Sequence, residues 1–188
     1  MIENDVLNLI AQVRPLGPKP SLITPASRDE ILSFEQQHGL NLPDELKSWF
    51  SCCNGARVNP GGLYPLFAPQ PELSLDWYLK NYPEWKARGW FPVASDGCGD
   101  LYIVAAGIRI GSVNTHPVCF LDQSDFEQPK YAVASGLWKF LYFLMKSEIS
   151  HQQGQQAAWP FSRDAVLGFD PALAECSEVP LPWEIDGE

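Results

Sequence analysis

The segment 90–106 constrains the fold of this chain more than any other. Two apolar runs, 90–94 and 101–106, are rich in aromatic and β-branched residues. The turn that joins them contains two glycines and two aspartates: Asp96, Gly97, Gly99 and Asp100. Apolar runs bounded by glycine and aspartate are typical of strands connected by a tight turn. The segment therefore predicts a β-hairpin against which the rest of the chain packs.

Further short apolar runs at 61–67, 108–113, 117–122 and 131–134 also have the length of strands. Their close spacing around the hairpin favours an antiparallel meander. The fold class that we expect is α+β, with a mostly antiparallel, twisted sheet of about five or six strands, helices packed against it and a C-terminal extension.

Two helices are predicted before the sheet. Ser27 and Glu30 have the spacing of a capping box, and Gly39 is placed to end that helix. Pro43 occupies a position suited to the first helical residue of the next helix. Apolar residues at helical spacing follow it: Leu46, Trp49, Phe50 and Cys53. Asn54 and Gly55 then end this helix, because both residue types accept a left-handed backbone.

Two more helices are expected after these. Ser74 caps one that Pro83 interrupts. The other covers about 135–150 and is apolar nearly all round, which predicts burial against a face of the sheet.

The ends of the chain differ from the middle. Residues 1–21 predict a weak helix and an extended lead-in broken by prolines. Residues 151–188 carry seven acidic residues and one basic residue, a net charge of −6 (7 − 1 = 6). Four aromatic residues are spread among the prolines there: Trp159, Phe161, Phe169 and Trp183. We expect this acidic extension to pack on or near a central domain at 22–150.

The composition limits the classes of function that this chain can have. The formal net charge is −10, from 13 basic and 23 acidic residues, which argues against nucleic-acid binding and favours a basic protein partner. No apolar run is long enough to span a membrane, and the N-terminus does not resemble a signal peptide, so we expect a cytoplasmic protein. Five cysteines without a CxxC pair indicate neither a disulfide framework nor a thiolate zinc site.

The residues offer few candidates for catalysis or metal binding. Asp96, Cys98 and Asp100 alternate as in the start of a calcium loop, but Leu101 and Gly107 stand where that loop needs glycine and glutamate. His116 and Cys119 lie three apart in a predicted strand, so their side chains point to opposite faces. We therefore expect no metal site, no cofactor and no enzymatic activity.

Two other groups leave alternatives open. Vicinal Cys52 and Cys53 fit a redox pair or simple burial at a helix end, and burial is favoured. Several aromatic residues could form a ligand platform or pack in the core: Trp77, Tyr78, Tyr82, Trp85 and Trp90. Their helical spacing favours the core.

With these elements in order, the chain resembles the SUKH superfamily, which contains the fungal Smi/Knr-type cell-wall assembly regulators and many bacterial immunity proteins. The resemblance covers about 22–150 and is carried by segments 31–35, 39–43, 44–50, 90–100 and the closing helix. Its structural motif residues are Pro43, Trp49, Asn54, Gly55, Trp90, Gly97 and Gly99.

The resemblance implies a non-enzymatic protein-binding domain. We expect a bacterial immunity protein that neutralises a toxin by steric and electrostatic occlusion, as a monomer or weak homodimer; the alternative is a regulatory scaffold that binds an endogenous protein. Five acidic residues on strand-end turns are the candidate partner-binding surface, unless they are only a solvated face: Asp96, Asp100, Asp122, Asp125 and Glu127.

Overall fold

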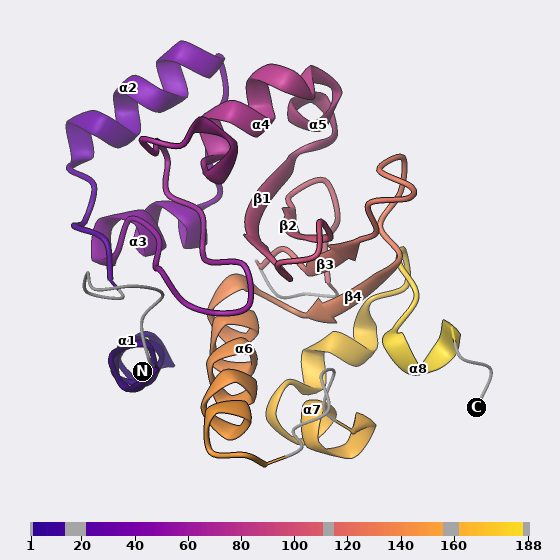
Figure 1. The fold of residues 1–188 in the computed structure, drawn as a ribbon. Helices are drawn as coiled ribbons and strands as arrows, with labels where there is room; N and C mark the ends of the chain where they lie inside the picture. The colour runs from indigo at the N-terminus through magenta and orange to yellow at the C-terminus, as the bar shows by residue number, and fades with distance from the viewer. Residues whose placement is uncertain (1, 14–21, 111–114, 156–161, 186–188) are drawn as a thin grey trace.

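The structure is a computed structural model that describes residues 2–13, 22–110, 115–155 and 162–185. It is an α+β fold in which helices surround a small antiparallel sheet (Figure 1). The α-helices in chain order are α1 (Ile2–Gln12), α2 (Arg28–His38), α3 (Asp44–Cys52), α4 (Leu75–Asn81), α5 (Pro83–Arg88), α6 (Leu137–Gln152), α7 (Arg163–Phe169) and α8 (Pro182–Ile185). Two 3₁₀ turns, η1 (Pro71–Leu73) and η2 (Pro171–Glu175), complete the helical elements.

The sheet contains β1 (Trp90–Ser95), β2 (Leu101–Ala105), β3 (Val118–Leu121) and β4 (Tyr131–Ala134), in that spatial order and antiparallel throughout. The predicted hairpin is therefore confirmed, with Trp90 opposite Ala105 and Ser95 opposite Leu101. Four strands form in the described residues, so the expected five or six strands are not confirmed.

Two of the predicted runs do not form strands in the described residues. In the run 61–67, Leu63 makes isolated bridges to Ala56 and Ala94, and Gly62 and Tyr64 bond to the backbone of β1. The pairing does not extend into a full strand, because Pro65 has no N–H to continue a ladder. In the run 108–113, the described part holds a single bridging residue, Ile110, and the remainder lies outside the described residues.

Local signals in the sequence place the helices correctly. The Ser27 hydroxyl accepts from the Glu30 N–H, and the Glu30 carboxylate accepts from the Ser27 N–H, which is the predicted capping box. Gly39 ends α2 in the left-handed conformation. Pro43 differs from the prediction: it is the N-cap of α3, with an extended ψ of 146°, and the helix starts at Asp44. The end of α3 also differs from the prediction: the helix stops at Cys52, and the cap is Cys53 in an extended conformation, whereas the positive φ of 90° at Gly55 lies in the turn that follows.

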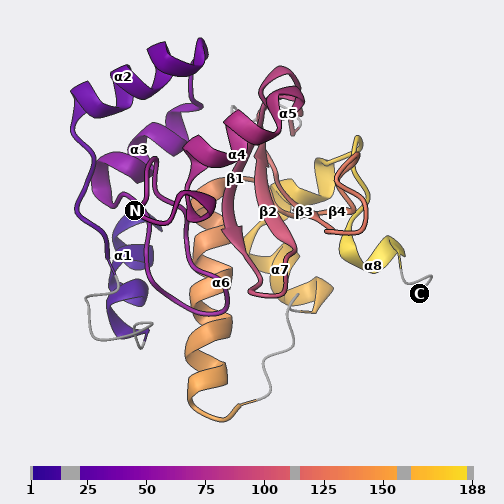
Figure 2. The ribbon, with the colours of Figure 1, turned by 45° about the horizontal axis from the view of Figure 1, so that its top comes forward.

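The core joins the helices to the sheet. Helix α6 lies between α1 and the sheet in both views (Figure 1, Figure 2). Trp138 on α6 packs edge-on against Trp49 on α3, with ring centroids 5.7 Å apart. Phe140, also on α6, contacts Tyr102 of β2 at 4.9 Å. The expected buried position of this helix is confirmed.

The first helix contributes more than a lead-in would. Val6 and Ile10 of α1 are fully buried and belong to the same hydrophobic core as the sheet. Because buried aliphatic side chains each stabilise a fold by about 1.5–3 kcal/mol, α1 is part of the packed structure.

The C-terminal extension packs at the β4 edge of the sheet and against α6. Helix α8 and η2 contact β4, and the Ala132 N–H donates to the Pro180 carbonyl at 2.9 Å, which covers the edge of that strand (Figure 2). Val166 and Leu173 are buried. These contacts involve residues within 162–185, whereas Trp159 and Phe161 lie outside the described residues.

Candidate partner-binding surface

The β1–β2 turn is held by its own aspartates. One carboxylate oxygen of Asp96 accepts from the Cys98 N–H at 2.7 Å and from the Asp100 N–H at 3.1 Å. Gly97 and Gly99 have φ of 81° and 116°, so an L side chain at either position would be strained. The turn geometry therefore explains why positions 97 and 99 are glycine, and it gives Asp96 a structural role as the acceptor of these two hydrogen bonds.

This turn lies beside the β3–β4 loop. Asp100 Oδ1 accepts from the Gln123 N–H at 2.8 Å, and Gln123 Nε2 donates back to the Cys98 carbonyl at 3.0 Å. Asp96, Asp100 and the start of the loop at Asp122 are therefore at the same end of the sheet, where β1 and β3 end.

The remaining acidic residues follow the β3–β4 loop toward α5. Phe126 packs edge-on against Trp85 at 5.5 Å. Arg88 donates to the carbonyl and the carboxylate of Glu127, the latter at 3.4 Å. The Asp125 carboxylate accepts from the Glu127 N–H at 2.9 Å. The five candidate residues thus form a strip along two connected turns rather than one compact cluster.

Two cations offset part of this negative charge. Lys130 Nζ lies 2.9 Å from Asp122, and Arg88 pairs with Glu127. Hydrogen bonds from the Ser124 hydroxyl and from Lys130 hold the pKa of Asp122 well below its usual range, so this carboxylate is charged at neutral pH. The Glu127 side chain is 86% exposed. Exposed pairs of this kind are weak, so both carboxylates are accessible to a partner's cations.

The family motif residues have structural roles. The Asn54 side chain accepts from the Leu66 N–H at 2.9 Å, and a Cβ at position 55 would come within 2.6 Å of the Leu63 carbonyl oxygen. Trp90 is buried beneath the Arg88 guanidinium, which lies 4.7 Å from its ring centroid. These residues position the segment 61–67 and the start of β1.

The described residues give no support to a metal site, a cysteine nucleophile or a redox pair. In the described part of the chain, no three His, Cys, Asp or Glu side chains gather as metal ligands would. The His116 ring bonds to the Ile108 carbonyl at 3.2 Å, whereas Cys119 is buried in β3. The Cys53 thiol is buried and donates to the Gly55 carbonyl, and burial raises its pKa to about 11. This thiol is therefore poorly suited to redox exchange.

The aromatic series forms a stack in which Trp85 is buried and Tyr78 and Tyr82 are half-buried against the core. The rings of Tyr82 and Trp85 are 4.4 Å apart and nearly parallel, and Tyr78 stacks on Trp85 at 5.8 Å. Trp85 is 1% exposed. This arrangement supports core packing over a ligand platform.

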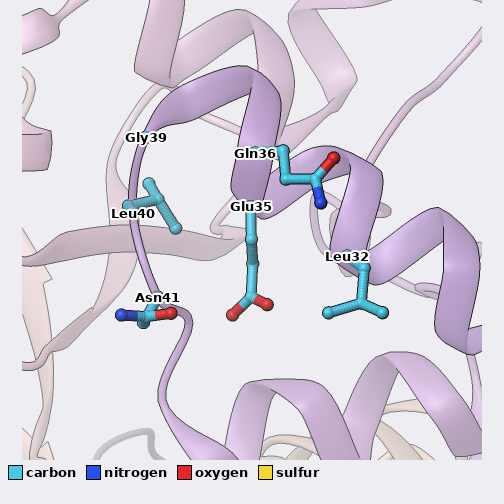
Figure 3. A pocket seen from close by; sticks show the side chains of 6 residues that line it. All are labelled: Leu32, Glu35, Gln36, Gly39, Leu40 and Asn41. Atoms are coloured by element: carbon cyan, nitrogen blue, oxygen red, sulfur yellow. The ribbon is translucent and has the colours of Figure 1, made fainter.

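A small surface pocket lies at the end of α2 (Figure 3). Its volume is about 300 Å³, and Glu35 points into it from the helix. The Glu35 carboxylate already accepts from the Leu42 N–H at 2.7 Å and pairs with Lys47 at 3.0 Å. The charged group in this pocket therefore ties α2 to α3.

A larger apolar groove, of about 570 Å³, was not predicted from the sequence. It lies between the segment 61–73 and the residues Ile23, Ala56 and Arg57, of which Ala56 bridges to Leu63. Ile23, Leu63 and Tyr64 line it, and Phe67 and Leu73 stand at its rim with 44% and 41% of their surface exposed. The signal that could have indicated it is the prolines within and after the predicted strand run 61–67, at Pro65, Pro69 and Pro71.

With this geometry described, the family can be stated. The model of the SMI1 / KNR4 family (SUKH-1) matches residues 25–142, which is more than half of the chain. The chain belongs to the SMI1 / KNR4 family. No curated protein matches it.

The predicted SUKH resemblance is therefore confirmed. SUKH-1 is a non-catalytic protein-binding family, and membership implies that this chain binds a protein partner. The matched region runs from α2 into α6 and contains all the motif residues, whereas α1 and the C-terminal extension lie outside it. None of the helices in the described ranges is long and apolar enough to cross a bilayer.

Proposed function

We propose that this SUKH-1 protein is an immunity-type binding protein that neutralises a cognate toxin by occupying the toxin's functional surface. Membership of the family carries the proposal, because the family fits a protein-binding immunity role. A net charge of −10 complements a basic toxin and would speed their association by electrostatic steering. The proposal includes a cytoplasmic location, a cofactor-free and non-enzymatic mechanism, and a monomer or weak homodimer.

The acidic strip on the β1–β2 turn and the β3–β4 loop is the surface that we propose for electrostatic contact. It comprises Asp96, Asp100, Asp122, Asp125 and Glu127. The hydrogen bond between Asp100 and Gln123 supports this assignment, because it keeps the two turns side by side. A fixed array of carboxylates discriminates among partners better than the same charges on independent loops.

Coexpression tests the immunity role. The toxin encoded beside this gene is expressed in a sensitive host with and without the SUKH-1 protein, and cell survival is measured. We expect survival only when both are present. Unchanged killing in the presence of folded SUKH-1 protein would remove the immunity role for that pair.

Charge removal tests the acidic strip. In the double variant Asp96→Asn with Asp100→Asn, the side-chain carbonyl of each asparagine can still accept the turn hydrogen bonds, so folding should be retained while two charges are lost. We expect toxin affinity to fall by about tenfold at low salt. Asp29→Asn on the exposed start of α2 is the matched control and should leave affinity unchanged. Equal affinity of all three proteins would exclude the strip as the contact surface.

A regulatory scaffold is the second candidate, because the matched family model is the SMI1 / KNR4 branch. The discriminating observation is gene context. A toxin gene next door supports immunity, whereas a position among housekeeping genes supports regulation of an endogenous protein.

A further inference from the structure

The apolar groove has the physical features of a preformed anchor site. Its floor is rigid, because Leu63 is bridged to both Ala56 and Ala94, and Pro65 and Pro69 restrict the backbone above it. A volume of about 570 Å³ is large enough for one aromatic or leucine-sized side chain with its flanking backbone. No rearrangement of the floor is required before an apolar side chain enters.

The rim of this groove is apolar and open. Phe67 rests edge-on against Phe34 of α2, 5.5 Å away, yet leaves nearly half of its surface exposed. Leu73 of η1 also lines the groove and is 41% exposed. Apolar residues exposed together around a hollow mark an interaction surface more often than single exposed residues do.

Two carboxylates belong to residues adjacent to the groove. Glu72 is exposed on η1, directly before the rim residue Leu73. The groove residue Gly61 is packed so closely against Ser95 and Gly97 that a Cβ there would lie 2.0 Å from Ser95 Oγ and 2.6 Å from the Gly97 nitrogen. Asp96, which stands between these two residues, is therefore close to the groove. Arg57 also lines the groove, which disfavours a cation inside it.

We propose that the groove receives an apolar side chain of the protein partner, phenylalanine- or leucine-sized, from a segment with basic residues on either side. This inference rests on the proposed function and names the contact that it uses. The apolar side chain fills the hollow beside Phe67 and Leu73, and the flanking cations lie toward Glu72 and Asp96. The groove and the acidic strip then form one continuous interface through the β1–β2 turn.

The first experiment uses the purified product of the neighbouring toxin gene, made catalytically inactive. Leu73→Ser removes a partly exposed apolar side chain at the rim, and we expect it to weaken toxin binding by about tenfold or more in protein whose folding is first verified by circular dichroism. Ile185→Ser in α8, equally exposed but remote from the groove, is the matched control and should bind as the unmodified protein does. Binding within twofold for both variants would overturn the groove as an anchor site while leaving the immunity role intact.

If the unmodified protein does not bind that toxin, the proposed function is removed for this pair. A second probe then tests the groove independently of the toxin. Fluorescent peptides Lys-Lys-Gly-Phe-Gly-Lys-Lys, the same sequence with serine for phenylalanine, and Glu-Glu-Gly-Phe-Gly-Glu-Glu are titrated by anisotropy. We expect binding of the basic phenylalanine peptide alone, with loss in Leu73→Ser. If no phenylalanine-dependent binding is detected up to about 1 mM peptide, the proposal is overturned. A dissociation constant of about 1 mM corresponds to a binding free energy of only about 4 kcal/mol.

Discussion

Gly55 is the single residue at which this fold should tolerate substitution least. Its φ of 90° strains any L side chain, and an added Cβ would meet the Leu63 carbonyl oxygen at 2.6 Å and the Pro65 nitrogen at 2.8 Å. Both contacts are backbone atoms of the groove floor, so neither can rotate away. The motif glycine therefore fixes how closely the end of α3 approaches the segment 61–67.

We predict that Gly55→Ala lowers the free energy of unfolding by about 2–4 kcal/mol, measured by denaturant titration. Gly39→Ala is the control: its φ is similarly positive at 61°, but no atom lies within 4 Å of the added Cβ, so about 1 kcal/mol is expected. Equal losses for the two variants would show that backbone strain alone, rather than the close approach, explains the requirement for glycine.

The reactivity of the five cysteine thiols should depend on whether each is buried or exposed. Cys52 and Cys98 are exposed, whereas Cys53, Cys119 and Cys176 are buried, and burial raises the pKa of each of these three thiols. Since the thiolate is the reactive form, we predict two fast-reacting thiols in the native protein and five in denaturant, counted with a chromogenic disulfide reagent at about pH 8. Fast labelling that persists in a Cys52→Ser, Cys98→Ser variant would contradict this division.

At the scale of elements, the start of α6 depends on its neighbours. Its N-cap is Gly136, which has no side chain to accept from the first helical N–H groups. The Glu45 carboxylate of α3 accepts from the Leu137 N–H at 3.0 Å. Asp170, which precedes η2, accepts from the Ser135 N–H at 2.7 Å and from the Ser135 hydroxyl at 2.6 Å. Carboxylates near a helix N-terminus also interact favourably with its dipole.

Glu45 gives this cap a pH dependence. Burial raises the pKa of Glu45 above its ordinary value, so ionisation is less favourable in the folded protein than in the unfolded chain. Its contribution to stability is therefore complete below the unfolded-state pKa and decreases as the pH rises through the folded-state pKa. Glu45→Gln keeps an acceptor for the Leu137 N–H but does not ionise.

We predict that Glu45→Gln becomes more stable relative to the unmodified protein as the pH rises from about 4 to 7, measured by thermal unfolding across that range. Asp29→Asn at the exposed start of α2 provides a surface control. A stability difference for Glu45→Gln that is constant with pH would contradict the role of burial.

Asp170 also ties the C-terminal extension to α6. Its side chain is fully buried, and besides Ser135 it pairs with Lys139 Nζ at 2.7 Å. We predict that Asp170→Asn costs about 3 kcal/mol of unfolding free energy and increases proteolysis of 163–185, because Lys139 then loses its anionic partner. Asp164→Asn, exposed on α7, should stay within about 0.5 kcal/mol. If Asp170→Asn resists the protease as well as the unmodified protein does, this ion pair is not required for docking of the extension.

At the scale of the whole molecule, both edges of the sheet are covered by the chain itself. Beside β1, the Tyr64 N–H donates to the Val93 carbonyl and the Ser95 N–H to the Gly62 carbonyl. Beside β4, Ala132 bonds to Pro180. Exposed strand edges would otherwise invite pairing with another chain. A partner is therefore expected to bind through side chains on loops rather than by adding a strand.

The overall charge should show in the kinetics of association. For the cognate toxin, we predict that the association rate constant falls by about tenfold between about 50 and 500 mM NaCl, while the dissociation rate constant changes little, measured by stopped-flow fluorescence. Steering by a net charge of −10 is screened by salt, whereas an apolar contact in the groove is not. An association rate that is independent of salt would argue against a basic partner.

The sequence alone determined the family, the hairpin and most helix boundaries, because these depend on local chemistry. Ser27 with Glu30 specifies a cap, and Gly39 specifies a helix end, each within a few residues. The family motif could be recognised for the same reason, since its residues serve turns and caps. The expected number of strands is not confirmed in the described residues, because apolar runs such as 61–67 resemble strands whether or not a neighbour is available to pair with them over their whole length.

Only the tertiary structure decided which distant residues meet. The capping of α6 by Glu45 and Asp170, the contact of Gly61 with the β1–β2 turn, and the hollow beside Phe67 and Leu73 join positions far apart in the chain. Such contacts depend on how whole elements pack, which local propensity and spacing do not encode. The acidic turn at 96–100 was visible in the sequence, but its place close to an apolar groove was not.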